Sequence, residues 1–153
     1  MGFMHHPFPM QIFRAYDIRG KVSLLNVSMV NAIAHGLAQQ YQSAGQTRVA
    51  IGYDARLSSP TYAHIIQRTL SLYAIEAHII GCCSSPMLYY IARQFDGNGI
   101  MVTASHNAKS DNGIKWILGG EPPTPDKIQQ VAAHASNDFL AHRQQPVAEQ
   151  PRS

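Results

Sequence analysis

Apolar residues recur three and four positions apart in three stretches of the chain, 27–41, 62–73 and 128–135. This is the spacing of one face of an α-helix, so each stretch predicts a helix with a buried face. Gly45 stands where the first helix would end, and Thr124-Pro125 stands where the third would begin. Glycine just after a helix and proline in its first turn are typical boundary residues, which supports these limits.

Two serine–proline pairs mark further helix starts. Ser59-Pro60 precedes the second stretch, and Ser85-Pro86 precedes a short run over 87–95. Serine is a common N-cap and proline is tolerated in the first helical turn. The sequence therefore predicts that the second helix opens at Ser59-Pro60 and that an additional short helix follows Ser85-Pro86.

Short apolar runs between these helices predict strands. The runs are residues 48–54, 76–81, 100–104 and 114–118. Asn112-Gly113 is typical of a turn and predicts an antiparallel edge pairing between the last two strands. Alternating strands and helices predict an α/β fold, a three-layer sandwich with a mixed, mainly parallel four-stranded sheet covered by helices on both faces.

The composition indicates the size of the folded domain and where it begins and ends. The chain has 153 residues, 45% of them apolar and 14% charged, which suits a single domain with a real core. A proline- and histidine-containing start predicts a flexible leader over 1–10, and polar residues predict a tail or linker over 142–153. The domain itself is expected over 11–141.

Charge and cysteine content narrow the partners and the compartment. The net charge is +3 without a dense run of lysine or arginine, which favours small anions over nucleic acid. No apolar run is long enough to span a membrane. Cys82 and Cys83 are adjacent and would make a strained disulfide, so we expect two free thiols in a reducing, cytoplasmic compartment.

The richest candidate chemistry follows the third predicted strand. In such a sheet, ligands bind beyond the carboxyl ends of the strands. The segment Thr103-Ala-Ser-His-Asn107, with Lys109 and Lys115, offers a hydroxyl, an imidazole, a carboxamide and two ammonium groups. This set suits a phosphoryl group or another anion. The chain has neither a GxSxG motif around Ser105 nor a P-loop, which disfavours an acyl hydrolase and a P-loop nucleotide site.

A second cluster of cations precedes the first helix. Arg14, Arg19 and Lys21 lie close together in sequence, and arginine is well suited to bidentate phosphate contacts. The alternative is a solvated segment in which Arg14 or Arg19 pairs with Asp17.

Four motifs, in order along residues 11–140, resemble one family. Thr103-Ala-Ser-His-Asn107 followed by Asn112-Gly-Ile-Lys115 resembles the phosphoserine loop of the α-D-phosphohexomutases, which include bacterial phosphomannomutase/phosphoglucomutase. Phe13-Arg-Ala-Tyr-Asp-Ile-Arg-Gly20, Gly52-Tyr-Asp-Ala-Arg-Leu-Ser58 and Ser85-Pro-Met-Leu-Tyr-Tyr90 resemble the other family motifs. The resemblance implies the N-terminal phosphoserine domain of such an enzyme.

The resemblance also implies a reaction and residue roles. A phosphoserine, here Ser105, would donate its phosphoryl group to a hexose phosphate and regain one from the hexose 1,6-bisphosphate, interconverting the 1- and 6-phosphates of mannose and glucose. By the same analogy, Mg²⁺ would bind the phosphate on Ser105. The remaining implied residues are His106 and Lys115 for catalysis, with Arg14, Tyr16, Arg19 and Asn107 for substrate binding.

The chain departs from the family pattern in ways that bear on activity. It has no Asp-x-Asp-x-Asp-Arg metal loop, and Ala108 replaces the usual proline after Ser-His-Asn. Family enzymes carry their metal and sugar-selecting loops on later domains. The expected partners are therefore the remaining domains of the same enzyme as well as the sugar phosphates, and the isolated chain is expected to be nearly inactive.

Other functions stay open from the residues alone. The chain could be a short phosphosugar-binding or regulatory module without turnover. It could instead be an assembly domain that self-associates through an exposed inter-domain face. A hydrolase acting through Ser105 is the weakest of these alternatives.

Overall fold

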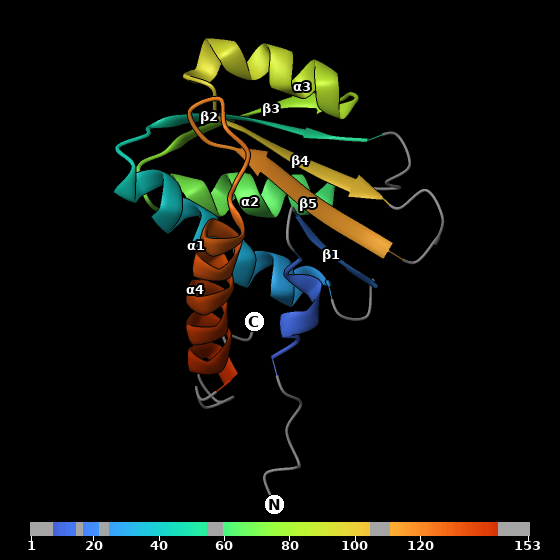
Figure 1. Ribbon diagram of the computed structural model, residues 1–153, viewed down its shortest axis with the longest axis vertical. Coiled ribbons are helices and arrows are strands. Elements are labelled where there is room, and N and C mark those ends of the chain that lie inside the picture. The colour runs from blue at the N-terminus through green and yellow to red at the C-terminus, as the bar shows by residue number, and fades with distance from the viewer. Residues whose placement is uncertain (1–7, 15–16, 22–24, 55–59, 105–110, 144–153) are drawn as a thin grey trace, which may run out of the picture.

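We describe the protein from a computed structural model that places residues 8–14, 17–21, 25–54, 60–104 and 111–143 (Figure 1). Helices and strands alternate along this part of the chain. The helices are α1 (Val27–Ser43), α2 (Thr61–Ser71), α3 (Ser85–Ala92) and α4 (Pro125–Arg143), with short 3₁₀ turns at Met10–Ile12 and Arg93–Phe95. The strands are β1 (Ile18–Lys21), β2 (Arg48–Tyr53), β3 (Glu76–Cys82), β4 (Gly99–Ala104) and β5 (Asp111–Ile117).

The strands form one mixed sheet in the order β1-β5-β4-β2-β3. Strand β2 runs parallel to β3 and to β4, whereas β5 runs antiparallel to β4 and to β1. The α/β class and the mixed sheet are confirmed, but the described sheet has five strands where four were predicted. The additional strand, β1, comes from the segment that the sequence presented only as a cluster of cations.

Helices cover both faces of the sheet, as predicted (Figure 1). The larger core lies on the face that carries α1 and α2, and α4 packs against α1. The other face carries α3, which packs on β2 and β4 around a small cluster of Ala50, Leu88 and Met101. The β1–β5 half of the α3 face is therefore more open, and it carries the partly exposed Arg19 and Lys115.

Local sequence explains most helix boundaries. Gly45 adopts a φ of 75° after α1, a left-handed conformation that glycine reaches without strain. The hydroxyl of Thr124 accepts a hydrogen bond from the Lys127 amide at 3.3 Å, consistent with the predicted start of α4. The α3 cap is one residue earlier than predicted, because the hydroxyl of Ser84, not Ser85, accepts the Met87 amide hydrogen bond at 3.2 Å.

Three other sequence expectations need correction. Asn112-Gly113 lies inside β5 and is not a turn, so this strand begins earlier than predicted. Strand β5 is also not the sheet edge, since β1 pairs beyond it. Phe8, which the sequence assigned to the leader, stacks on Phe13 with ring centroids 5.6 Å apart.

Candidate functional site

The motif-bearing segments meet at one edge of the sheet. Strands β1, β2, β3 and β4 run in one direction, because β5 is antiparallel to both β1 and β4. Their carboxyl ends, and the beginning of β5, therefore lie at the same edge, which we call the carboxyl edge. In open α/β sheets this is where ligands bind.

Pairing of β1 with β5 brings two of the motifs side by side (Figure 1). Arg19 lies opposite Gly113, and Gly20 lies opposite Asn112. The end of the first motif thus becomes a hydrogen-bonded neighbour of the strand that carries Lys115. The sequence showed both motifs but not their adjacency.

Side-chain alternation places the two cations on the same face. Ile18 and Ile114 are fully buried in the core beneath the sheet. Arg19 and Lys115 are their immediate neighbours in sequence, so they point to the opposite face, toward the α3 side. The side chain of Arg19 is 43% exposed. The β1–β5 half of the α3 face is therefore electropositive and accessible.

The ion pair that the sequence left open as an alternative is present. Arg19 Nη2 donates to Asp17 Oδ2 at 3.0 Å. A guanidinium has five N–H donors, so this contact orients Arg19 and leaves donors for an anion. Arg14 is exposed, and its Nε donates to the carbonyl oxygen of Gln11 at 3.1 Å. No contact between Arg14 and Arg19 is found among the described residues.

A tyrosine of α3, Tyr89, interacts electrostatically with Asp17. Burial, and secondarily the negative charge of Asp17, raise the pKa of Tyr89 above its ordinary value. The phenol therefore remains neutral at physiological pH. Tyr89 therefore adds no charge to this half of the α3 face.

Four residues of the expected site lie outside the described part of the chain. They are Tyr16, Ser105, His106 and Asn107. The described strands bracket the last three, since β4 ends at Ala104 and β5 begins at Asp111. Their roles remain predictions.

The sequence missed a buried polar contact behind the site. Asn112 Nδ2 donates to the carbonyl oxygen of Leu25 and to Tyr62 Oη, both at 3.3 Å, and Tyr62 Oη donates to the same carbonyl at 3.1 Å. This triangle ties the beginning of β5 to the segment that leads into α1 and to the first turn of α2. The Asn-Gly pair gave a signal for a turn, which concealed the burial of Asn112.

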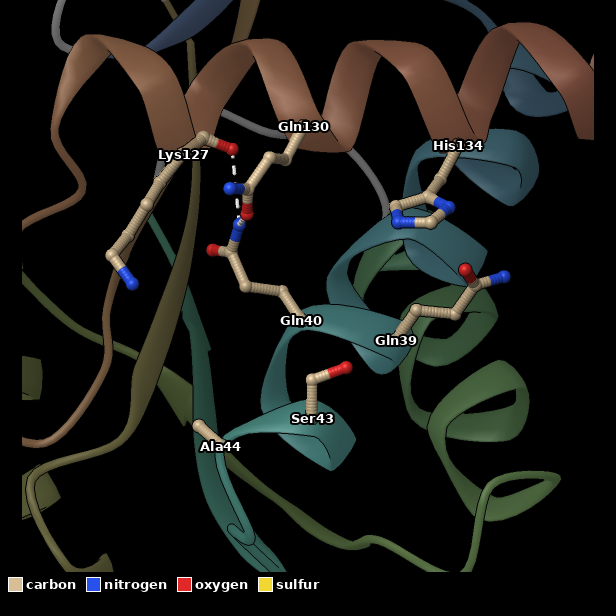
Figure 2. Close-up of a pocket in the computed structure, with 7 residues that line it drawn as sticks. All are labelled: Gln39, Gln40, Ser43, Ala44, Lys127, Gln130 and His134. Atoms are coloured by element: carbon tan, nitrogen blue, oxygen red, sulfur yellow. Dashed lines mark hydrogen bonds between the residues drawn. The ribbon is translucent and has the colours of Figure 1, made fainter.

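A pocket of about 210 Å³ lies elsewhere, between α1 and α4 (Figure 2). Its lining residues are Gln39, Gln40, Ser43, Ala44, Lys127, Gln130 and His134. Four of them lie at the end of α1, which leads into the amino end of β2, and the other three lie on α4. The pocket is therefore toward the edge opposite the motifs. The Gln40 side-chain nitrogen already donates to the Lys127 carbonyl oxygen at 3.0 Å and to Gln130 Oε1 at 3.4 Å. Both of its N–H groups are therefore in use.

Neither a metal-binding cluster nor a membrane-spanning helix is found among the described residues. Within the described residues, no group of three or more histidine, cysteine, aspartate or glutamate side chains could hold a metal ion. In the same residues, none of the helices has the length and apolar character needed to cross a membrane. The free thiols of Cys82 and Cys83 agree with the sequence prediction.

Known proteins match the chain in sequence. A 38% identical phosphoglucomutase from Neisseria meningitidis serogroup A aligns over 133 residues, which are 85% of this chain and 29% of that protein. A phosphomannomutase/phosphoglucomutase from Pseudomonas aeruginosa strain PAO1 is 33% identical over 87% of this chain and 29% of its own length. The chain thus spans less than a third of these relatives.

Solved structures match as well. A phosphoglucomutase/phosphomannomutase family protein from Burkholderia thailandensis superposes with a TM-score of 0.75 and 26% identity, over 88% of this chain and 31% of that one. The family model for phosphoglucomutase/phosphomannomutase, alpha/beta/alpha domain I, matches residues 10–141. The chain therefore belongs to the phosphoglucomutase/phosphomannomutase family and corresponds to its domain I.

Proposed function

We propose that this chain is the phosphoserine-bearing N-terminal domain of a phosphohexomutase that interconverts hexose 1-phosphates and 6-phosphates of mannose and glucose. Family membership supports the proposal, as does the match to domain I over residues 10–141. The remaining domains of the enzyme would be its partners, because the relatives are more than three times as long as the aligned segment.

One structural observation carries the proposal. The pairing of Arg19 with Gly113 puts the opening motif beside the strand that carries Lys115. That strand is also the continuation of residues 105–110, which hold Ser105. Two cationic side chains therefore share one open face next to the exit of the proposed phosphoserine segment.

The proposed reaction assigns specific roles to residues of this chain. The phosphoryl group would move from Ser105 Oγ to a hydroxyl oxygen of the hexose phosphate, and that hydroxyl would release its proton. The second phosphoryl group of the resulting hexose 1,6-bisphosphate would then return to Ser105 Oγ. Arg19 would offset the negative charge of the group in transit, while Lys115 Nζ would take up the proton that the hydroxyl releases in the first transfer and return it to the sugar oxygen that the second transfer frees. His106, Asn107, Arg14 and Tyr16 are proposed to contact the group or the sugar.

The described residues do not form a magnesium site on their own. Mg²⁺ prefers several oxygen ligands in octahedral geometry, and the described part of the chain gathers no such cluster. We assign the ion to the phosphate on Ser105, with its other ligands outside this chain. The ion would supply charge neutralisation when bound. The isolated chain would accordingly be nearly inactive as a catalyst.

The proposed location is the cytoplasm. The two free thiols, Cys82 and Cys83, support a reducing compartment.

The test is peptide mapping of the protein isolated from its native cells. Phosphate on Ser105, in a polypeptide that also contains further domains, is the expected result. Unmodified Ser105 in a polypeptide of 16.9 kDa would refute the proposal and favour a short phosphosugar-binding module. A Ser105→Ala variant of the same polypeptide is the control, since any phosphate that remains on it belongs to another residue.

A further inference from the structure

The pocket between α1 and α4 is lined by polar side chains from both helices (Figure 2). Lys127, Gln130 and His134 occupy positions i, i+3 and i+7 of α4, which form one stripe along a helix. Gln39 and Ser43 line the pocket from the last turns of α1. A helix rises about 1.5 Å per residue, so the stripe from Lys127 to His134 is roughly 10 Å long. The pocket is therefore elongated, with Lys127 at one end and His134 at the other.

Gln40 forms a fixed inner wall of this pocket. It is 7% exposed, and its nitrogen donates to the Lys127 carbonyl oxygen and to Gln130 Oε1. Its own oxygen accepts the indole N–H of Trp116. Gln130 is thus held through its oxygen, and its amide nitrogen keeps both N–H donors for another group. The wall is pre-formed, because every polar atom of the Gln40 side chain already has a partner.

The side chains around this wall have donors that the fold does not use. Among the described residues, no hydrogen bond or ion pair is found for the Lys127 ammonium, the Ser43 hydroxyl, the Gln39 amide or the His134 ring. An ammonium carries three N–H donors, and a hydroxyl or a primary amide can both donate and accept. The pocket therefore presents one charged donor together with several neutral groups of either kind.

The pocket is electropositive. Lys127 supplies a full positive charge, and the lining residues include no carboxylate. The acidic residues of α4, Asp126 and Asp138, are not among them. The carboxyl end of a helix is electronegative through its free carbonyl groups, but at the end of α1 the carbonyl oxygens of residues 40–42 accept from the amides of residues 44–46. Little negative charge is left there to oppose an anion.

The volume and the donor set define the class of ligand. A space of about 210 Å³ corresponds to roughly seven water molecules, which is below the range of sites for drug-sized ligands. It suits a molecule of about four carbons and excludes a nucleotide. One ammonium balances one carboxylate, and the amides and the hydroxyl match hydroxyl groups on the same molecule.

We propose that the pocket between α1 and α4 binds a small hydroxylated monocarboxylate. Lys127 Nζ donates to the carboxylate, and Gln39, Ser43 and Gln130 contact the hydroxyl groups of the ligand. The ligand carries no phosphoryl group, and its site lies toward the edge of the sheet opposite Arg19. The inference therefore stands independently of the proposed mutase function.

Erythronate, a four-carbon hydroxy acid, is the probe, and erythritol is its uncharged counterpart. Each is titrated into the ¹⁵N-labelled full chain and followed by NMR. Erythronate should shift the amide signals of Ser43 and Gln130 with a Kd on the order of 1 mM, from one charged and a few neutral hydrogen bonds. It should also shift the indole N–H signal of Trp116, the single tryptophan, through Gln40. Erythritol should bind at least about tenfold more weakly.

Substitutions of Lys127 test the charged contact. Lys127→Gln should weaken erythronate binding about tenfold, whereas Lys127→Arg keeps the charge and should bind within about threefold of the wild type. The side chain of Lys127 is exposed and Gln40 binds only its backbone carbonyl, so both variants should fold. Arg68→Gln is the matched control, because it removes one positive charge from an exposed position on α2 that does not line the pocket. It should leave binding unchanged.

Three results would overturn the proposal. The first is the absence of shifts at Ser43, Gln130 and Trp116 up to about 10 mM erythronate, including the case in which shifts occur only around Arg19. The second is equal affinity for erythritol and erythronate, which would make the site one for neutral polyols. The third is wild-type affinity in Lys127→Gln. None of these results bears on phosphate at Ser105, so the mutase function is tested separately.

Discussion

The indole N–H of Trp116 donates a hydrogen bond to Gln40 Oε1 at 3.0 Å, deep between β5 and α1. Trp116 is 1% exposed and Gln40 is 7% exposed. The Gln40 amide nitrogen continues the chain of contacts to the Lys127 carbonyl oxygen at the beginning of α4 (Figure 2). One buried side chain thus joins the sheet, α1 and α4.

Removing this side chain should destabilise the domain. Gln40→Ala would leave the Trp116 N–H without its acceptor and would open a small cavity, at a combined cost of about 2–4 kcal/mol. Urea unfolding followed by tryptophan fluorescence measures the change. Gln39→Ala is the matched control, since the half-exposed Gln39 side chain makes no such hydrogen bond among the described residues and its loss should cost under about 0.5 kcal/mol. Equal losses in both variants would contradict the assigned role.

Helix α1 packs against α4 at Gly36. This contact predicts that Gly36→Ala destabilises the protein, although alanine is the better helix former. Alanine is favoured over glycine in a helix by about 1 kcal/mol. A Cβ at Gly36, however, would lie 2.9 Å from the carbonyl oxygen of Val131 and 3.3 Å from its Cα. Backbone cannot yield as a side chain can, so Gly36→Ala should lower the free energy of unfolding by about 1–3 kcal/mol.

The Gly36 experiment has an informative double variant. Adding Val131→Ala removes the Val131 methyl group that would lie 3.1 Å from the new Cβ, but not the backbone contacts. The double variant should therefore recover little of the loss. A Gly36→Ala protein that is more stable than the wild type in urea unfolding would show that propensity outweighs the helix contact.

Much of the fold could be predicted from the sequence because the local spacing of apolar residues specifies its longer helices and its buried strands. The structure contains the helices predicted from apolar periodicity, α1 and α4, and the strands predicted from apolar runs, β2 and β4. Their boundaries differ from the predicted ones by a few residues. Strand β1 could not be found this way. It has four residues, and Ile18 is the one among its described side chains that enters the core, so its pairing with β5 is specified by contacts distant in sequence.

The candidate site was predictable only in part for the same reason. Motif order identified Arg19 and Lys115, but their shared face follows from strand pairing. The contact between Thr103 Oγ1 and Gly113 also joins different strands and leaves no periodic signal. Asn112 was misassigned because Asn-Gly is typical of tight turns, whereas its side-chain amide here donates to the Leu25 carbonyl oxygen and to Tyr62 Oη on the core side of the sheet.

Tyr41 predicts how stability depends on alkaline pH. Burial, with a smaller contribution from Tyr89, raises the pKa of Tyr41 well above its ordinary value of 10.0, and its hydroxyl donates to the Ile117 carbonyl oxygen at 2.7 Å. The folded state keeps the proton while the unfolded state loses it. The contribution of Tyr41 is therefore complete below about pH 10 and declines as pH rises toward the folded-state pKa.

Tyr41→Phe tests this dependence. The variant should be less stable at neutral pH by about 1–3 kcal/mol, because the Ile117 carbonyl oxygen loses a buried donor. Above about pH 10 its stability should fall less steeply with pH than that of the wild type. Urea unfolding across this pH range gives both slopes. Tyr90→Phe, at a position 63% exposed, is the control and should follow the wild-type slope.

The adjacent thiols should react at different rates. Burial, and secondarily the neighbouring Cys82, raise the pKa of the Cys83 thiol, and its sulfur packs over Gly52. Cys82 is exposed. Because the thiolate is the reactive form, iodoacetamide at neutral pH should alkylate Cys82 first, as peptide mass mapping would show. Faster labelling of Cys83 would contradict the packing described for it.

Arg19 should contribute more to anion binding than its ion pair with Asp17 contributes to stability. The Arg19 side chain is 43% exposed, so solvent screening limits the contribution of the ion pair to the free energy of unfolding to under about 1 kcal/mol. Arg19→Ala should therefore unfold at nearly the wild-type urea concentration, yet bind inorganic phosphate several-fold more weakly because a cation beside Gly113 is lost. Arg19→Lys keeps the positive charge but not the planar set of donors. Its phosphate affinity should lie between those of the wild type and Arg19→Ala. Asp17→Asn removes the competing carboxylate and should bind phosphate at least as tightly as the wild type. Weaker phosphate binding by Asp17→Asn would instead mean that the ion pair holds Arg19 in the orientation that the anion requires.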